Sequence, residues 1–201
     1  MQGDQDWFKA RLGKVTGSRI KDVLSKGRGK NPSVTRQNYL YQIIAERLME
    51  TPKEEVRARS LKWGNDVEPY AREAYEIKNG VLVEQVDFVD HGALDWVGCS
   101  PDGNVEDGGI EIKCPIDPAV HIATVINGMP EDHKPQVQFN MWVCKWNWCD
   151  FISFQPLVDE RVRLYVERIT PDLEFVANMK KELSVFLQEV DMYYQQLTKG
   201  E

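Results

Sequence analysis

The stretch Cys99-Ser100-Pro101-Asp102-Gly103, followed nine residues after its aspartate by Glu111-Ile112-Lys113, decides how this chain folds. Side chains alternate along a strand, so Glu111 and Lys113 share one face of residues 110–114 and the apolar side chains occupy the other. Between the two halves, residues 104–109 are polar and end in two glycines, as in a tight hairpin turn. Such a hairpin returns Asp102 to the side of Glu111.

Two carboxylates and one amine that converge in this way suit a divalent cation. Mg²⁺ prefers oxygen ligands, retains several waters and is usually held by one or two carboxylates. Lys113 then has a task beyond structure, which is to orient and polarise an attacking water beside a phosphate. The alternative from these residues alone is a hairpin with a surface salt bridge.

The same residues carry a resemblance to a known family. The Asp102, Glu111 and Lys113 pattern resembles the PD-(D/E)xK nuclease signature. The longer stretches 100–103 and 111–115 are similar to those of the lambda-type phage exonucleases of the YqaJ-like viral recombinase family. Three further blocks resemble the family and occur in its order: residues 7–18, Trp63-Gly64 with Glu68, and residues 136–142. The likeness therefore spans roughly residues 6–156.

The resemblance implies a fold and an activity. The fold is an α/β restriction-endonuclease-like core, with a central mixed β-sheet flanked by helices. The activity is Mg²⁺-dependent 5′→3′ digestion of linear double-stranded DNA to 5′-mononucleotides, which leaves a 3′ overhang for recombination; Mn²⁺ is expected to substitute. The family also implies a homotrimer, a single-strand annealing protein as partner, and a phage or prophage protein working in the cytoplasm of a bacterial host.

The resemblance further assigns roles to individual residues. Asp102, Glu111 and the carbonyl of Ile112 are expected to ligate Mg²⁺, and Lys113 to position and activate the water. Glu68 is expected to aid a second ion or its waters, and Gln136 to hydrogen-bond water or phosphate. Asp90 and Asp95 are open candidates for a further aspartate that the family has upstream.

A second cluster of candidate residues lies near the N-terminus. Residues 16–18 precede a short apolar segment and read as a helix start, where free N–H groups and the helix dipole favour anions. Arg11 and Ser18 are the expected phosphate ligands, by guanidinium fork and by hydroxyl or amide, although from these residues alone Ser18 also fits a plain N-cap. The family assigns matching residues to the DNA 5′-phosphate, and Ser100 is a further expected donor.

Composition agrees with a DNA-facing enzyme once it is divided along the chain. The 201 residues carry a net charge of −7, but the first 65 hold 14 Lys and Arg against 7 Asp and Glu. The remainder holds 11 against 25, which fits a basic DNA-facing surface joined to an acidic body but equally fits two solvated faces without a role in binding. We expect one exonuclease domain over residues 1–201, no membrane span, no signal peptide and four free cysteines.

Periodicity and caps predict the remaining elements. Thr35 is expected to cap a helix whose buried stripe includes Leu40, Ile44 and Leu48, and Ser60 to start another that ends at Gly80. Residues 25–33 read as a basic loop. Further expected elements are strands at 81–89, 151–154 and 163–168, and helices at 6–13, 117–128, 130–146 and from 170 onward.

Two rival functions follow from the same residues. A site-specific or structure-specific endonuclease on this core would need a base-reading element, and none is evident beyond residues 25–33. A non-catalytic DNA-binding recombination module is disfavoured by the intact set of Asp102, Glu111 and Lys113.

Overall fold

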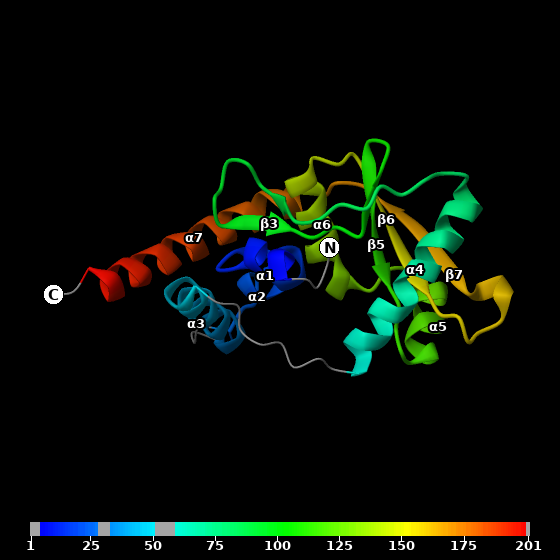
Figure 1. Ribbon diagram of the computed structural model, residues 1–201, viewed down its shortest axis with the longest axis horizontal. Helices are drawn as coiled ribbons and strands as arrows, with labels where there is room; N and C mark the ends of the chain where they lie inside the picture. Colours follow the sequence, from blue (N-terminus) through cyan, green and yellow to red (C-terminus); the bar gives the residue numbers. More distant parts are fainter. Residues whose placement is uncertain (1–4, 28–32, 51–58, 200–201) are drawn as a thin grey trace.

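The computed structural model describes residues 5–27, 33–50 and 59–199, which form two mixed β-sheets with helices packed around them (Figure 1). The larger sheet has the order β4-β5-β6-β7 and the smaller one the order β1-β3-β2. The larger sheet consists of β4 (Gly103–Val105), β5 (Gly108–Lys113), β6 (Cys149–Phe154) and β7 (Leu164–Ile169). The smaller sheet consists of β1 (Val15–Thr16), β2 (Val89–Asp90) and β3 (Val97–Cys99).

The predicted central hairpin is confirmed as β4 and β5. Gly103 lies opposite Ile110 and Val105 opposite Gly108 in an antiparallel pair. The turn needs a left-handed residue, and Glu106 supplies it with φ 52°. This register places Asp102, the residue before β4, at the level of Glu111 on β5.

Each face of the larger sheet is covered by different helices. On one face Ile110, Ile112 and Ile152 pack in a cluster with Val67 and Tyr75 of α4 (Arg59–Asn79). The opposite face is covered by α5 (Pro118–Asn127) and α6 (Lys134–Cys144), with Val137 and Met141 against Phe151. Side chains alternate along β5, so Glu111 and Lys113 share one face as predicted, and this face is the one that α6 covers.

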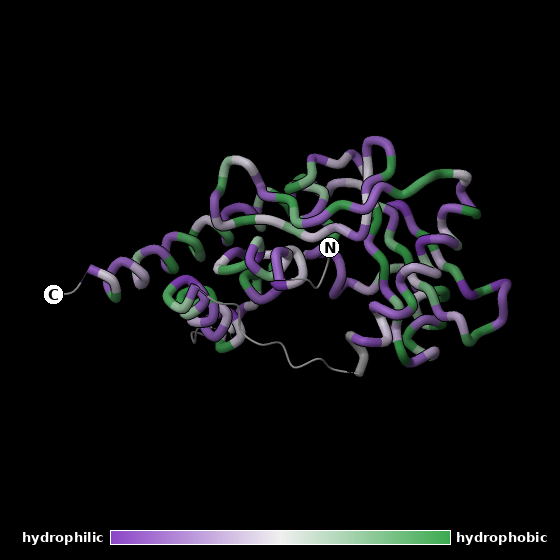
Figure 2. Tube along the Cα trace, viewed as in Figure 1, coloured by the Kyte–Doolittle hydropathy of each residue, from purple (hydrophilic) through white to green (hydrophobic). Residues whose placement is uncertain are grey.

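A second core surrounds the smaller sheet. It is formed by α2 (Ile20–Val23), α3 (Val34–Met49), the long α7 (Leu173–Thr198) and the strands β1 and β3. Polar and apolar residues alternate along α7, as expected of a helix with one buried face (Figure 2). The apolar stripe of α7 is buried at Met179, Leu183, Phe186 and Val190, whereas Leu197 is exposed.

The structure corrects several predicted elements. Residues 81–89 form no continuous strand: Glu84 makes one antiparallel bridge to Asn104, and β2 begins only at Val89. The strand β4 has three residues, so it offers that segment little edge to pair with. The cap of α3 is Ser33, not Thr35, because the Ser33 hydroxyl accepts the Arg36 N–H.

On α3, the end of the predicted stripe is also wrong. Tyr39, Leu40, Ile43 and Ile44 are buried, but Leu48 is exposed and Arg47 takes a buried position instead. The predicted helix start at residues 16–18 is a 3-10 turn, Gly17–Arg19, whose cap Thr16 makes no side-chain capping bond. Most of the basic loop predicted at 25–33 lies outside the described residues.

The other predicted elements are confirmed within a few residues. The predicted strands near residues 151 and 163 are β6 and β7, and the last helix is capped by Asp172, whose side chain accepts the Phe175 N–H. The N-terminal helix is α1 (Gln5–Arg11). Among the described residues, no helix combines the length and apolar character that crossing a bilayer requires.

Candidate active site

A cleft of about 380 Å³ opens where the hairpin, α4, α6 and the N-terminal segment meet. Every residue that the sequence analysis assigned to the metal or to the phosphate lines this one cleft. They are Arg11, Ser18, Glu68, Ser100, Asp102, Glu111, Ile112, Lys113 and Gln136. Segments from four parts of the sequence therefore converge as expected.

The hairpin fixes the position of Asp102. Its Oδ2 accepts a hydrogen bond of 2.7 Å from the Ile112 N–H, which locks the carboxylate against the end of β5. The Ile112 side chain packs in the core, and the residue also lines the cleft next to Asp102 and Glu111.

Glu111 is the buried centre of a polar cluster, with an exposed fraction of 1%. Lys113 Nζ lies 2.5 Å from Glu111 Oε1, and Asn140 Nδ2 donates a 3.0 Å hydrogen bond to Glu111 Oε2. Lys113 also donates to Gln136 Oε1 at 3.2 Å. Gln136 and Asn140 are one helical turn apart on α6, so a single helix face serves both members of the Glu111–Lys113 pair.

Burial and mutual repulsion perturb the acidic groups of the cleft. Desolvation, with Asp102 nearby, raises the pKa of Glu68 to about 7, and Arg72 acts in the opposite direction. Desolvation also raises the pKa of Glu111, against the attraction of Lys113. Burial acts against the charged form of Lys113, yet Glu111 and Asp102 together raise its pKa, so the lysine stays protonated.

Glu68 is held by a cation that the sequence analysis did not identify. Arg72, one turn further along α4, forms a 2.6 Å ion pair with Glu68 and approaches the Asp102 carbonyl at 3.5 Å. The arginine thus joins α4 to the start of the hairpin. The i, i+4 spacing of Glu68 and Arg72 on a predicted helix was the sequence feature that could have identified this pair.

The donor set of the cleft fits Mg²⁺. It offers the carboxylates of Asp102, Glu111 and Glu68 and the Ile112 carbonyl, all hard oxygen ligands, and a bound cation would favour the charged forms of the carboxyls whose pKa values burial raises. Within the described residues, no three acidic, histidine or cysteine side chains are grouped so that they could hold a metal ion. Mg²⁺ is usually bound through one or two carboxylates and several waters, so a pair such as Asp102 and Glu111 is enough for it.

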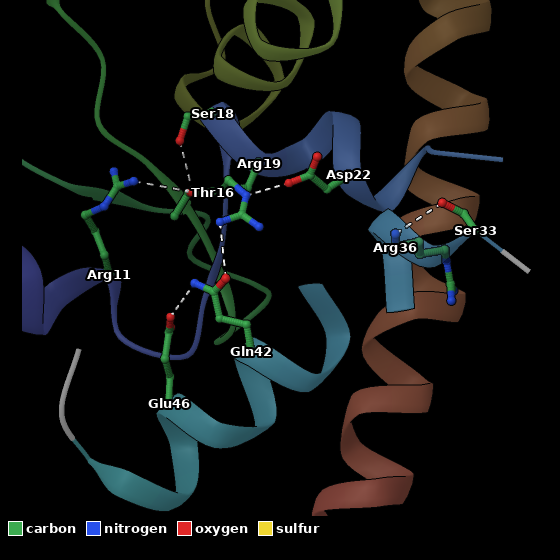
Figure 3. Close-up of polar contacts among 9 residues, drawn as sticks. All are labelled: Arg11, Thr16, Ser18, Arg19, Asp22, Ser33, Arg36, Gln42 and Glu46. Atoms are coloured by element: carbon green, nitrogen blue, oxygen red, sulfur yellow. Dashed lines mark hydrogen bonds and ion pairs between the residues drawn. The ribbon is translucent and has the colours of Figure 1, made fainter. Parts of the chain in front are cut away.

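The basic end of the cleft is built around Arg11. Its Nη1 donates a 2.8 Å hydrogen bond to Ser100 Oγ, and its Nη2 lies 3.5 Å from Thr16 Oγ1. Thr16 Oγ1 in turn lies 3.5 Å from Ser18 Oγ (Figure 3). The guanidinium also lies 4.1 Å from the Trp7 ring centroid. The three predicted phosphate ligands are therefore adjacent, and Thr16 is an unpredicted member of the group.

Other residues considered from the sequence lie elsewhere. Asp90 forms a 2.5 Å ion pair with Lys14, and neither Asp90 nor Asp95 lines the cleft. The four cysteines are free, and the Cys99 and Cys144 sulfur atoms lie 3.4 Å apart. Asn140, by contrast, lines the cleft although the sequence assigned it no role.

Comparisons with known proteins agree with this geometry. The model of the YqaJ-like viral recombinase domain matches residues 6–147. An alkaline exonuclease (LHK-Exo) from Laribacter hongkongensis is 36% identical over 98% of this chain and 97% of its own, with a TM-score of 0.89. Its complex with dAMP gives the same TM-score, coverage of 98% and 97%, and 35% identity.

A more distant structure shares the fold alone. A phage related exonuclease from Haemophilus somnus 129PT is 14% identical over 92% of this chain and 96% of its own, with a TM-score of 0.76. Among curated proteins, no sequence matches the chain.

Proposed function

Because the chain belongs to the YqaJ-like viral recombinase family, we propose that it is a Mg²⁺-dependent exonuclease that digests linear double-stranded DNA in the 5′→3′ direction. It is a nuclease, an enzyme that hydrolyses phosphodiester bonds, and DNA is its substrate class. The products are 5′-mononucleotides and a duplex with a 3′ overhang.

The observation that carries this proposal is that one cleft combines candidate ligands for a metal ion with candidate ligands for a phosphate. At one end Asp102 and Glu111 provide oxygen ligands beside the cation of Lys113. At the other end Arg11 and Ser100 form a hydrogen-bonded pair that suits a phosphate. A scissile phosphate beside Lys113 and a terminal phosphate of the same strand beside Arg11 would then share this cleft.

Asp102, Glu111 and the Ile112 carbonyl would hold Mg²⁺, with Glu68 at a second ion or its waters. When bound, the ion would stabilise the negative charge that develops on the scissile phosphate and would lower the pKa of a water molecule. Lys113, kept protonated and held between Glu111 and Gln136, orients the attacking water and stabilises charge on the scissile phosphate. Gln136 holds the lysine and contacts water or phosphate.

The direction of digestion follows from the phosphate site. If Arg11, Ser18 and Ser100 hold a terminal 5′-phosphate, the bond to be cut is fixed at a constant distance from that anchor. Each cut then leaves a new 5′-phosphate for the same site, and the released product is a 5′-mononucleotide. The relative LHK-Exo forms a complex with dAMP, which is a mononucleotide, and this supports the proposed product.

Family membership also supports the proposed assembly and setting. We expect a homotrimer around the duplex, a single-strand annealing protein that receives the 3′ overhang, and action in the cytoplasm of a bacterial host. Mn²⁺ should replace Mg²⁺, since both accept octahedral oxygen coordination.

The test uses linear duplex DNA labelled at its 5′ ends, with a closed circle of the same sequence beside it. Mg²⁺ should permit release of labelled mononucleotide from the linear DNA only, EDTA should abolish it, and Asp102→Ala should be inactive. Cleavage of the circle would favour an endonuclease. Binding of DNA without hydrolysis under any metal would favour the non-catalytic module.

A further inference from the structure

Gly13 is the turn residue between Arg11 and β1, and helix α3 holds both of its backbone polar groups. The Gly13 N–H donates to Glu46 Oε2 at 3.1 Å, and its carbonyl accepts from Arg47 Nε at 3.1 Å. Gly13 has φ 67°, and an added Cβ would lie 2.6 Å from Arg47 Cγ. A glycine in the left-handed region therefore fits under two consecutive side chains of α3.

The turn at Gly13 connects the residues assigned to the phosphate. The Lys14 N–H donates to the Arg11 carbonyl at 3.1 Å, which closes the turn directly after Arg11. On its other side β1 carries Thr16 and runs parallel to β3, which leads into Ser100. A shift of Gly13 would therefore move Arg11 and Thr16 relative to Ser100.

Helix α3 also reaches the far end of this segment. Glu46 Oε1 accepts from Gln42 Nε2 at 2.8 Å, and Gln42 Oε1 accepts from Arg19 Nη1 at 3.3 Å. Arg19 is itself paired with Asp22 (Figure 3). Since Arg19 follows Ser18 directly, the Glu46 carboxylate is connected to both ends of residues 13–19.

Burial of the charged Arg47 side chain is energetically unfavourable, which indicates that its hydrogen bond to Gly13 has a specific role. The residue is 9% exposed, its guanidinium lies 3.7 Å from the Trp96 ring centroid, and burial lowers its pKa to about 10. Its Nη2 finds no hydrogen-bond partner within the described parts of the chain. An apolar side chain could fill this space without such a penalty, but it could not donate to the Gly13 carbonyl.

We propose that Glu46 and Arg47 are positioning residues for the terminal phosphate, which fix the turn at Gly13 and so place Arg11 and Ser18 in the cleft. The inference rests on the proposed function, because it takes Arg11 and Ser18 as ligands of the 5′-phosphate. Neither Glu46 nor Arg47 lines the cleft, so their effect is exerted through the backbone.

The experiment compares duplexes that differ only in carrying a 5′-phosphate or a 5′-hydroxyl. For each protein, the initial rate in Mg²⁺ and the dissociation constant in EDTA are measured on both ends, together with the melting temperature. Glu46→Ala removes the acceptor for Gly13, and Arg47→Met removes the donor while retaining an unbranched stem over Trp96. Both should reduce the preference for phosphorylated ends by about tenfold or more, since small displacements of positioned groups are costly.

Two variants separate this effect from general destabilisation. Glu46→Gln keeps one oxygen that can accept the Gly13 N–H, although its amide can no longer accept from Gln42 Nε2 as well, and it should retain most of the wild-type preference. Arg36→Met is the matched control, because Arg36 is on the same helix and its bidentate pair with Glu189, at 2.7 and 3.0 Å, lies away from the turn. It should lower the melting temperature and leave the preference unchanged.

The possible failures are distinct. If Glu46→Ala and Arg47→Met keep the wild-type preference, the positioning role is wrong although the exonuclease and its phosphate anchor stand. If Arg36→Met loses the preference as strongly as they do, the effect is one of stability and the inference is also wrong. If the wild-type protein does not distinguish the two ends, the phosphate anchor itself fails and the inference fails with it.

Discussion

Asn140 Nδ2 donates a 3.0 Å hydrogen bond to Glu111 Oε2, on the side of the carboxylate opposite Lys113. The side chain of Asn140 is 1% exposed, and its Oδ1 has no hydrogen-bond partner among the described residues. An added Cβ on Gly17 would collide with that Oδ1, so the cleft wall is shaped around this amide. We infer that Asn140 orients Glu111, which is a ligand of the proposed Mg²⁺.

Asn140→Ala should therefore lower kcat about 10- to 100-fold, the range for a residue that orients a metal ligand. Steady-state kinetics over a range of Mg²⁺ concentrations provides the measurement. Gln138→Ala is the matched control, since Gln138 is a buried amide on the same helix that binds Thr170 and Asp172 instead. If both variants lose stability and keep kcat, Asn140 is only structural.

The second prediction concerns pH and metal together. The raised pKa of Glu68, about 7 against an ordinary 4.5, means that ionisation of this group disfavours the folded state. In EDTA its contribution to stability is present below about pH 4.5 and is lost as pH rises through 7. Bound Mg²⁺ offsets this loss, so it should raise the melting temperature more at about pH 8 than at about pH 5.

Thermal unfolding in Mg²⁺ and in EDTA at the two pH values measures this difference. Glu68→Gln should shrink it, because the neutral amide no longer ionises. An equal Mg²⁺ effect at both pH values would contradict the assignment of the acidic cluster as the metal site.

The third prediction separates the chemical from the structural role of Lys113. Lys113→Met keeps the length of the side chain and removes the charge, so kcat should fall roughly 10²- to 10³-fold, as for one lost transition-state contact. In EDTA the melting temperature should also fall, because Glu111 would lose its 2.5 Å counter-charge. Lys134→Met, which breaks the 2.9 Å pair with Asp172 outside the cleft, should leave kcat unchanged. Normal turnover by Lys113→Met would restore the salt-bridge interpretation.

The local sequence pattern was sufficient to predict the central hairpin of the larger sheet. Alternation along residues 110–114 and a polar turn between Asp102 and Glu111 predicted the hairpin, and both depend only on neighbours in sequence. The long periodic helices were predicted for the same reason. The roles assigned to the site residues remain predictions, although the structure brings all of these residues to one cleft.

The predictions that failed concern features that depend on contacts between segments distant in sequence. Residues 81–89 have strand-like alternation, but only a three-residue edge is available to them. On α3 the helical period favours Leu48 as the buried residue, whereas the backbone of Gly13 requires the donor that Arg47 supplies. A side chain that hydrogen-bonds to the backbone of a turn distant in sequence does not show up in the hydrophobic periodicity of its own helix.

Gly64 is a glycine that the helix itself does not need. It lies inside α4, has no positive φ, and an added Cβ would meet no atom within 4 Å among the described residues. Alanine is favoured over glycine in a helix interior by roughly 0.5–1 kcal/mol, so the fold alone would prefer alanine here. Yet Gly64 lines the cleft one turn before Glu68. We infer that the DNA strand passes close to α4 at this glycine.

Gly64→Ala should therefore raise the melting temperature and also raise KM for DNA. A glycine with a purely structural role would not give a gain in stability together with a loss in substrate binding. The added methyl group occupies space meant for substrate, and a misfit of this size should raise KM about tenfold. Ser184→Ala, at an exposed position of α7 away from the cleft, supplies the control for helix propensity, because it should stabilise the helix and leave KM unchanged. Thermal unfolding and exonuclease kinetics on both variants give the answer. A Gly64→Ala protein that is more stable and binds DNA as well as the wild type would show that the strand does not approach α4 there.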